Sequence, residues 1–269
     1  MLVSPRGILL PALREGRLVG AFNAGNMEMV MGILQAAEEL DKPILLQVAE
    51  KRLRHSPLHL IGPLLVSAAR QAKTPVAVQL DHGETDAVVA QALALGFTGV
   101  MFDGSALPPE ENIARTSRVR ALAGGAWIEG EIGVLGGSEG GPAAQALHTD
   151  PAQAQRFAEA SGCDCLAVAI GNAHGHYQGR PRLNFAILED IRRRLPDMPL
   201  ALHGGSGIPR EDLARAARLG VCKVNIATAS FDALWQGAAN RGADYFALSQ
   251  AMAQAVYEST RRQLMSFEV

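Results

Sequence analysis

The feature that most restricts the fold is a regular alternation of apolar, strand-like segments with helix-like segments. Several strand-like segments are continuous apolar runs, which is typical of parallel strands covered on both faces. Helical patterns separate them, and residues 26–41 carry apolar residues at positions i, i+3, i+4 and i+7. The eight strand-like segments are residues 18–24, 43–49, 75–80, 99–104, 126–133, 165–175, 199–207 and 221–228.

Eight strand–helix units in 269 residues predict one (β/α)8 TIM barrel that spans residues 1–269, because both the count and the length match that fold. No linker or low-complexity tract divides the chain. The alternative is a doubly wound open sheet. Such sheets bind ligands where the strand order reverses, and the G-x-G-x-x-G sequence that often marks this site is absent after the first strand.

Charge and composition disfavour several kinds of partner. The formal net charge is −2, which gives no attraction to nucleic acid or to an anionic membrane. No apolar run reaches the roughly 18 residues of a membrane span, and the N-terminus lacks the apolar core of a signal peptide. The three cysteines match no disulfide or zinc-ribbon spacing. We therefore expect a soluble, cytoplasmic protein.

Polar residues gather at one end of the expected strands. In a TIM barrel, catalytic groups lie at the C-terminal ends of the strands. Strand starts of this chain carry almost no such groups, with Lys223 as the main exception. The polar residues at or near the strand ends are Asn23, Asp81, His82, Asp103, Glu129, Glu131, Asn172, His174, His203, Asn225 and Thr228.

Three of the seven histidines, His82, His174 and His203, end strands in this way, and a glycine follows each. A single histidine at a strand end usually bonds to a backbone carbonyl. Three imidazoles around one barrel mouth instead favour Zn²⁺ with one open position. Asp81 then predicts a general acid or base beside the metal, although it is also placed to cap the following helix.

Two glycine-rich segments lie at the same mouth. "HGGSG" (203–207) follows the seventh strand and precedes a helix, so its N–H groups favour a phosphate. The longer segment 133–150 follows the fifth strand and carries Glu139. This segment predicts either a disordered surface loop or a lid that brings a catalytic carboxylate over the mouth.

These motifs together resemble the class II (zinc-dependent) ketose-bisphosphate aldolases, which include the fructose- and tagatose-bisphosphate enzymes. The resemblance covers most of the chain from about residue 19 to residue 228. The segments that carry it are "GAFNAGNMEM", "TPVAVQLDHG", "GVMFDGSALPPEENI", "IEGEIGVLGGSEGG", "GNAHGHY", "PLALHGGSGIP" and "VCKVNIAT".

The resemblance implies a reversible cleavage of a phosphorylated ketose to dihydroxyacetone phosphate and an aldehyde, through an enediolate that zinc stabilises. Asp81 then exchanges a proton with the C4 hydroxyl, and Glu139 handles the C3 proton. The implied zinc ligands are His82, His174 and His203, with Glu131 as an alternative ligand.

The resemblance also implies a pocket for dihydroxyacetone phosphate and a monovalent cation, Na⁺ or K⁺, near its phosphate. It implies a homodimer or homotetramer with a small sugar phosphate as substrate. The residues that match the pocket are Asn23, Gly175, Gly204, Gly205, Ser206, Asn225 and Thr228.

Three other functions stay open at this stage. A lysine Schiff base also serves aldol cleavage, but Lys223 starts a strand and is expected to face the opposite rim. A zinc-dependent TIM-barrel hydrolase and a non-catalytic sugar-phosphate-binding paralogue are the alternatives. The aldehyde half of the substrate is also open, because "VAEKRLRHSP" (48–57) departs from the family pattern. Ala227 stands where fructose-bisphosphate enzymes often have aspartate. In this respect the chain resembles the tagatose-bisphosphate branch.

Overall fold

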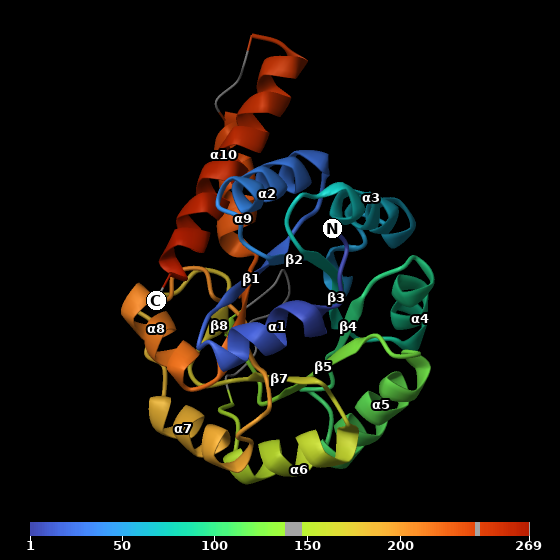
Figure 1. Cartoon of the computed structure of the whole chain (residues 1–269), viewed down its shortest axis with the longest axis vertical. Coiled ribbons are helices and arrows are strands. Elements are labelled where there is room, and N and C mark those ends of the chain that lie inside the picture. The colour runs from blue at the N-terminus through green and yellow to red at the C-terminus, as the bar shows by residue number, and fades with distance from the viewer. Residues whose placement is uncertain (138–146, 240–242, 269) are drawn as a thin grey trace.

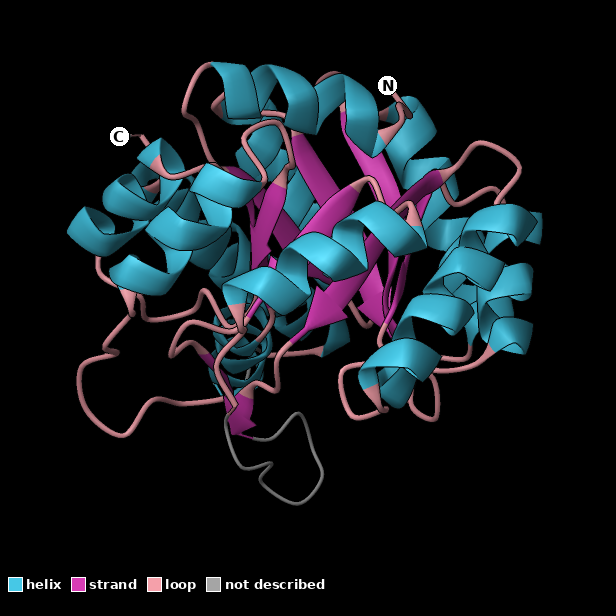
Figure 2. Cartoon of the chain, turned by 90° about the horizontal axis from the view of Figure 1, so that it is seen from below, coloured by secondary structure: helices cyan, strands magenta, loops and turns pink. Residues whose placement is uncertain are grey.

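A computed structural model describes residues 1–137, 147–239 and 243–268 (Figure 1). Eight parallel strands close into one barrel, which confirms the TIM barrel and shows that the open-sheet alternative is wrong. Figure 2 shows the strands enclosed by helices. In barrel order the strands are β1 (Val19–Asn23), β10 (Val221–Ile226), β9 (Leu200–Leu202), β7 (Cys165–Val168), β5 (Trp127–Ile132), β4 (Gly99–Phe102), β3 (Val76–Gly83) and β2 (Ile44–Ala49).

The helices between the strands begin with the expected capping chemistry at several places. The Asn26 side chain accepts a hydrogen bond from the Met29 N–H, and Asp150 caps its helix in the same way. The helices around the barrel are α2 (Met27–Glu39), α3 (Leu58–Gln71), α4 (Asp86–Ala94), α5 (Pro109–Leu122), α6 (Pro151–Ser161), α7 (Phe185–Arg194), α8 (Arg210–Arg218), α9 (Thr228–Ala239) and α10 (Tyr245–Ser266).

A further helix, α1 (Pro5–Arg14), closes the end of the barrel at which the strands begin. It lies across the centre of Figure 1. Its buried Ile8, Leu9 and Ala12 pack against inward-facing strand residues such as Val19 and Trp127. Since this end is plugged by apolar side chains, the opposite end is the only mouth that the described residues leave for a polar site.

The sixth barrel strand is shorter than the sequence indicates. β7 ends at Val168, and the chain then turns at Gly171, whose φ is +103°. A Cβ atom at that position would lie 2.4 Å from the Arg182 carbonyl oxygen, so only glycine fits. His174 therefore lies outside the barrel sheet, in the two-residue strand β8 (Ala173–His174), which pairs with β6 (Gly136–Gly137).

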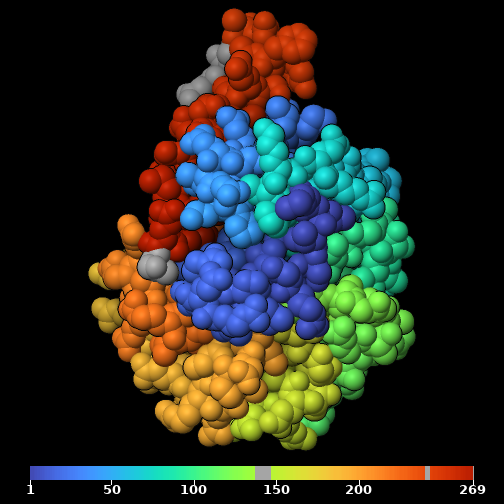
Figure 3. Space-filling model, in the orientation of Figure 1, coloured from blue at the N-terminus to red at the C-terminus, as the bar shows by residue number. Residues whose placement is uncertain are grey.

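The last two helices form a hairpin that projects sideways from the barrel (Figures 1 and 3). Near the barrel, α10 packs against both α2 and α9. The exposed aromatic residues Trp235, Tyr245 and Phe246 lie toward the far end of the hairpin, where 77%, 68% and 79% of their surfaces are accessible. None of the helices in the described part of the chain is long and apolar enough to cross a bilayer.

Candidate metal centre and substrate pocket

The end of β3 places two adjacent side chains, Asp81 and His82, at the same mouth. Successive strand residues normally face opposite sides of a sheet. Here the register against β4 shifts between Leu80 and Gly83, and His82 has a φ of +43°. Such a bulge re-aims a side chain, and bulges are enriched beside active sites. The irregular backbone at His82 therefore allows the neighbouring side chains of Asp81 and His82 to face the same mouth.

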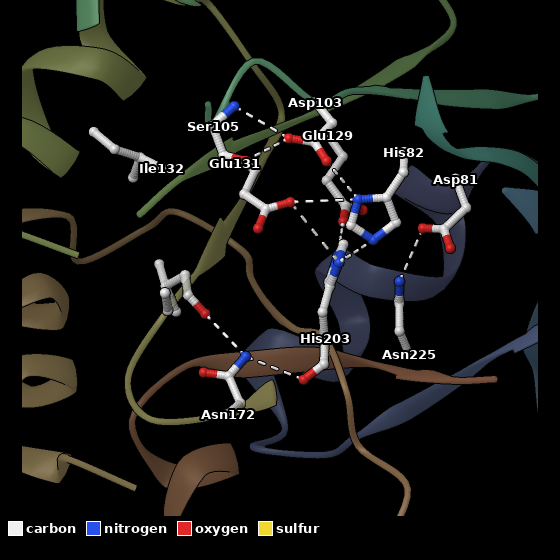
Figure 4. Close-up of polar contacts among 12 residues, drawn as sticks. Asp81, His82, Asp103, Ser105, Glu129, Glu131, Ile132, Asn172, His203 and Asn225 are labelled. Carbon is white, nitrogen blue, oxygen red and sulfur yellow. Dashed lines mark hydrogen bonds and ion pairs between the residues drawn. The ribbon is translucent and has the colours of Figure 1, made fainter. Parts of the chain in front are cut away.

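The three histidines converge as the sequence predicts. Their candidate ligand nitrogens all lie within 4.8 Å of one another. His203 Nδ1 is 2.9 Å from His82 Nε2, and the His174 ring centroid is 4.9 Å from that of His82. Figure 4 shows His82 and His203 pointing toward one another. His82 lies on β3, His174 lies on β8, and His203 directly follows β9. The site therefore depends on three separate segments of the chain.

Carboxylates orient two of these imidazoles by accepting hydrogen bonds from the ring nitrogens that face away from the shared position. His82 Nδ1 donates to Asp103 at 2.7 Å, and Asp103 is itself held by the hydroxyl and N–H of Ser105. His203 Nε2 donates to Glu129 at 2.8 Å. Each histidine therefore turns its other nitrogen toward the shared position, in the arrangement that metal-binding histidines usually show.

The protonation of the cluster also suits a cation. Burial lowers the pKa of His203, and burial with the positive charge of His82 lowers that of His174 to about 2, so both rings are neutral. Burial disfavours a charge on His82 as well, but the Asp81 and Asp103 carboxylates outweigh this and raise its pKa. A proton and a metal ion thus compete for the nitrogen that His82 turns to the centre.

Glu131 is the strongest sign that a cation belongs here. Its Oε2 atom is buried without a hydrogen-bond partner among the described residues, 3.6 Å from His82 and 4.0 Å from His203. Burial and the charge of Asp103 raise the pKa of Glu131 well above its usual range. A divalent metal among these groups would satisfy the orphaned oxygen and offset the repulsion between carboxylates. The residues present therefore fit a metal, and the position of Glu131 is compatible with the alternative ligand that the sequence suggests.

Asp81 is held beside this cluster as an ionised carboxylate. The side-chain amides of Asn225 and Asn23 each donate to it at 2.9 Å, one to either oxygen. Burial would raise its pKa, but the positive charges of His82 and Lys223 and the hydrogen bond from Asn23 outweigh burial and lower the pKa. Asp81 does not cap α4, since Thr85 does so. The helix-cap alternative is therefore wrong.

A pocket beside the cluster is lined by most of the residues that the sequence places there. It runs to Thr228, the first residue of α9, where the Ser206 hydroxyl accepts a hydrogen bond from the Ala229 N–H. Gly205 is not among the lining residues, and its N–H donates to the Asn225 carbonyl. Glu139 lies outside the described residues. The lining residues are Asn23, Asp81, His82, His174, Gly175, Gly204, Ser206, Asn225, Ala227 and Thr228.

Lys223 does not face the opposite rim, so that expectation is wrong. It is fully buried inside the barrel, with Nζ 2.8 Å from Glu129 Oε2. Burial would lower its pKa, but Glu129 outweighs burial and raises it, so the amine stays protonated. A protonated, ion-paired amine cannot attack a carbonyl, which still disfavours the Schiff-base route. The supporting roles of Glu129 and Lys223 were missed, although their polarity at inward-facing positions is visible in the sequence.

A TIM barrel whose mouth holds three converging imidazoles beside an ionised carboxylate has the arrangement expected of a metal-dependent enzyme. The chain belongs to the class II fructose-bisphosphate aldolase family, whose family model matches residues 3–268. This membership makes the protein an aldolase of a generally metal-dependent family. The hydrolase and the non-catalytic paralogue are not favoured.

Similar proteins carry related names. A fructose-bisphosphate aldolase of Geobacillus stearothermophilus is 40% identical over 235 residues, which cover 84% of this chain and 81% of that protein. A sulfofructosephosphate aldolase of Alkalicoccus urumqiensis is 41% identical over 231 residues, with 84% and 80% covered. The crystal structure of the YdjI aldolase from Escherichia coli K12 aligns with a TM-score of 0.91 at 32% identity, over 100% of this chain and 98% of that one.

Proposed function

We propose that the chain is a zinc-dependent aldolase that reversibly cleaves a phosphorylated ketose to dihydroxyacetone phosphate and an aldehyde. The observation that carries the proposal is the convergence of His82, His174 and His203 beside the ionised Asp81. When bound to these nitrogens, zinc supplies Lewis-acid chemistry that stabilises the negative charge of an enediolate. Neutral imidazoles at a site with an open position suit this metal.

Asp81 is proposed to take the proton of the C4 hydroxyl as the bond between C3 and C4 breaks, and to return it during condensation. Two features support this role: its lowered pKa keeps it in the basic form, and the amides of Asn23 and Asn225 fix both of its oxygens. Glu139 is proposed to exchange the C3 proton from its loop.

The pocket next to the histidines is proposed to hold dihydroxyacetone phosphate. The start of α9 supports a phosphate there, because helix N-termini favour anions and the pocket reaches Thr228. Gly175 and Gly204, with φ values of +83° and +64°, bring backbone to the same pocket. Gly205 contributes shape, since its N–H is already bonded. A monovalent cation, Na⁺ or K⁺, is proposed near the phosphate.

The aldehyde half is proposed to contact the segment after β2. Ser56 donates to the Gly25 carbonyl at 2.5 Å, and Arg52 lies 4.1 Å above the ring of Phe231. Gly25 and Phe231 are two and three residues from the pocket-lining Asn23 and Thr228, so this segment borders the pocket. The two relatives with similar identity are named for a bisphosphate and for a sulfo sugar phosphate, so similarity does not choose the distal group.

A condensation screen tests this proposal. Purified protein with zinc and dihydroxyacetone phosphate should consume at least one of glyceraldehyde 3-phosphate, sulfolactaldehyde, lactaldehyde and glycolaldehyde, as followed by mass spectrometry of the ketose product. EDTA should abolish the reaction, and zinc should restore it. A reaction that is insensitive to chelators and is trapped by borohydride would contradict the metal mechanism.

A cytoplasmic homodimer or homotetramer is also proposed. The three cysteines are free, as expected in a reducing compartment. Among the described residues of the α9–α10 hairpin, residues 228–239 and 243–256 carry no lysine or arginine and only two acids, and the charged residues Glu258, Arg261 and Arg262 follow toward the end of α10. The stretch up to residue 256, which carries Trp235, Tyr245 and Phe246, is therefore poor in charge, and this suits a second copy of the same hairpin better than a charged partner. Trp235, Tyr245 and Phe246 together offer roughly 450–750 Å² of apolar contact, a large part of a stable interface.

Sedimentation equilibrium tests the assembly. The wild-type chain is expected to be at least dimeric at micromolar concentration, and Trp235→Ser with Phe246→Ser should shift it to monomer. Leu122→Ser is a matched control, since Leu122 is 50% exposed on α5, away from the hairpin. A monomeric wild type, or a double variant that stays assembled, would contradict this interface.

A further inference from the structure

A buried ion pair lies inside the barrel next to the histidine cluster. Glu129 and Lys223 are both fully inaccessible to solvent, and their charged groups meet at 2.8 Å. Glu129 also accepts hydrogen bonds from His203 Nε2 at 2.8 Å and from the Gln79 side chain at 2.9 Å. The Glu129 carboxylate therefore contacts both the buried Lys223 ammonium group and the His203 nitrogen that faces away from the proposed metal position.

The positions of these residues follow from strand alternation. Glu129 precedes Glu131 by two residues, Lys223 precedes Asn225 by two, and Gln79 precedes Asp81 by two. Because residues two apart on a strand face the same side, the three side chains form a layer one step deeper than the site. Trp127 lies two residues before Glu129, and Val19 lies four residues before Asn23. Both belong to the apolar cluster at the end of the barrel where the strands begin.

Stability alone does not explain a charged pair at this depth. Burying two charges costs solvation energy, and apolar residues of similar volume often serve a core as well or better. The pair instead defines the protonation state of His203. An ionised carboxylate can only accept a hydrogen bond, so the Glu129 contact places the proton of His203 on Nε2 and leaves the lone pair on Nδ1.

We propose that Glu129 and Lys223 are positioning residues for the metal: Glu129 fixes the orientation and tautomer of His203 through its hydrogen bond, and Lys223 holds the Glu129 carboxylate in place through the ion pair. This inference rests on the metal site of the proposed function. With a neutral partner in place of Glu129, His203 is free to carry its proton on Nδ1, the nitrogen that faces His82 and the shared position. That tautomer does not bind a metal through Nδ1.

The double substitution Glu129→Gln/Lys223→Met tests the proposal, because it removes both charges and leaves no unpaired one in the core. Zinc affinity, measured by competition with a chromophoric chelator, is expected to fall about 10–100-fold, as is typical of outer-shell partners. The visible spectrum of the cobalt-substituted protein should change as well. The Tm of the metal-free protein separates these effects from a loss of folding.

Gln47→Leu is the matched control. Gln47 is fully buried, pairs in register with Gln79 and makes no side-chain hydrogen bond among the described residues. Its substitution should leave zinc affinity and the cobalt spectrum unchanged. A double variant that binds zinc as tightly as the wild type, with the same spectrum, would overturn the positioning role while leaving the metal site intact. A wild type that binds no zinc would overturn both.

A measurement on the unmodified protein covers the case in which the double variant does not fold. Long-range proton–nitrogen NMR spectra of zinc-loaded protein with labelled histidine report the tautomer of His203. The proton is expected on Nε2 and the metal on Nδ1. A proton on Nδ1 would overturn the proposal.

Discussion

Asp81→Asn is expected to lower kcat for ketose cleavage by about 10²–10⁴-fold, the usual contribution of a general acid–base residue. Asparagine has nearly the same size and can stay between Asn23 and Asn225, but its amide has no basic oxygen that takes a proton. The variant should fold. Its zinc affinity should remain close to that of the wild type, because Asp81 is not one of the candidate metal ligands. Steady-state kinetics with a coupled assay for dihydroxyacetone phosphate measure the loss.

A second reaction separates proton transfer at C4 from the rest of the chemistry. Dihydroxyacetone phosphate alone exchanges its C3 proton with deuterium oxide when it is enolised, and this step does not involve a C4 hydroxyl. Asp81→Asn should therefore retain the exchange while cleavage is lost. Equal losses in both reactions would contradict the specific role of Asp81 and would indicate a general disturbance of the site.

His174→Ala is expected to reduce zinc affinity by more than the 10–100-fold typical of outer-shell changes, and to bring activity near the background. The reason is direct: His174 is proposed to supply one of the three nitrogens that converge among the described residues, and its lowered pKa keeps that nitrogen free of a proton. Metal content after dialysis, read by atomic emission, and the rate of ketose cleavage measure the two effects.

His176→Ala is the matched control for that substitution. His176 is two residues away, but its side chain is 77% exposed and pairs with Asp232 on the surface. Its removal should change zinc content and activity little, since exposed ion pairs contribute little energy. An active, zinc-replete His174→Ala protein would show that His174 is not a ligand.

Much of the fold was predictable because parallel strands and covering helices have distinct apolar periods. The barrel follows from the count of strand–helix units, and the convergence of His82, His174 and His203 follows from their places at strand ends. Two details were not predictable. The bulge at His82 depends on the register between β3 and β4, which no local pattern encodes. The two-residue strand that carries His174 is defined by pairing with β6, far away in the sequence.

Lys223 shows a different limit of sequence reasoning. Its position at the start of a strand suggested the opposite rim, but a long side chain spans more than one layer of a barrel. It reaches Glu129, and Glu129 reaches His203. Polar residues spaced by two on neighbouring strands, such as Glu129 with Glu131, are the signal that predicts such a layer. Which of them pair depends on barrel geometry and on charge balance in the core.

In the proposed function, a metal held by the three histidines activates dihydroxyacetone phosphate. The most direct test is deuterium incorporation at C3 of dihydroxyacetone phosphate, followed by proton NMR, because it requires no knowledge of the aldehyde. Rapid exchange is expected with the zinc-loaded protein, none after chelation, and recovery when zinc is added back. Exchange that persists in the fully metal-free protein, or its absence in the zinc-loaded protein, would contradict the account.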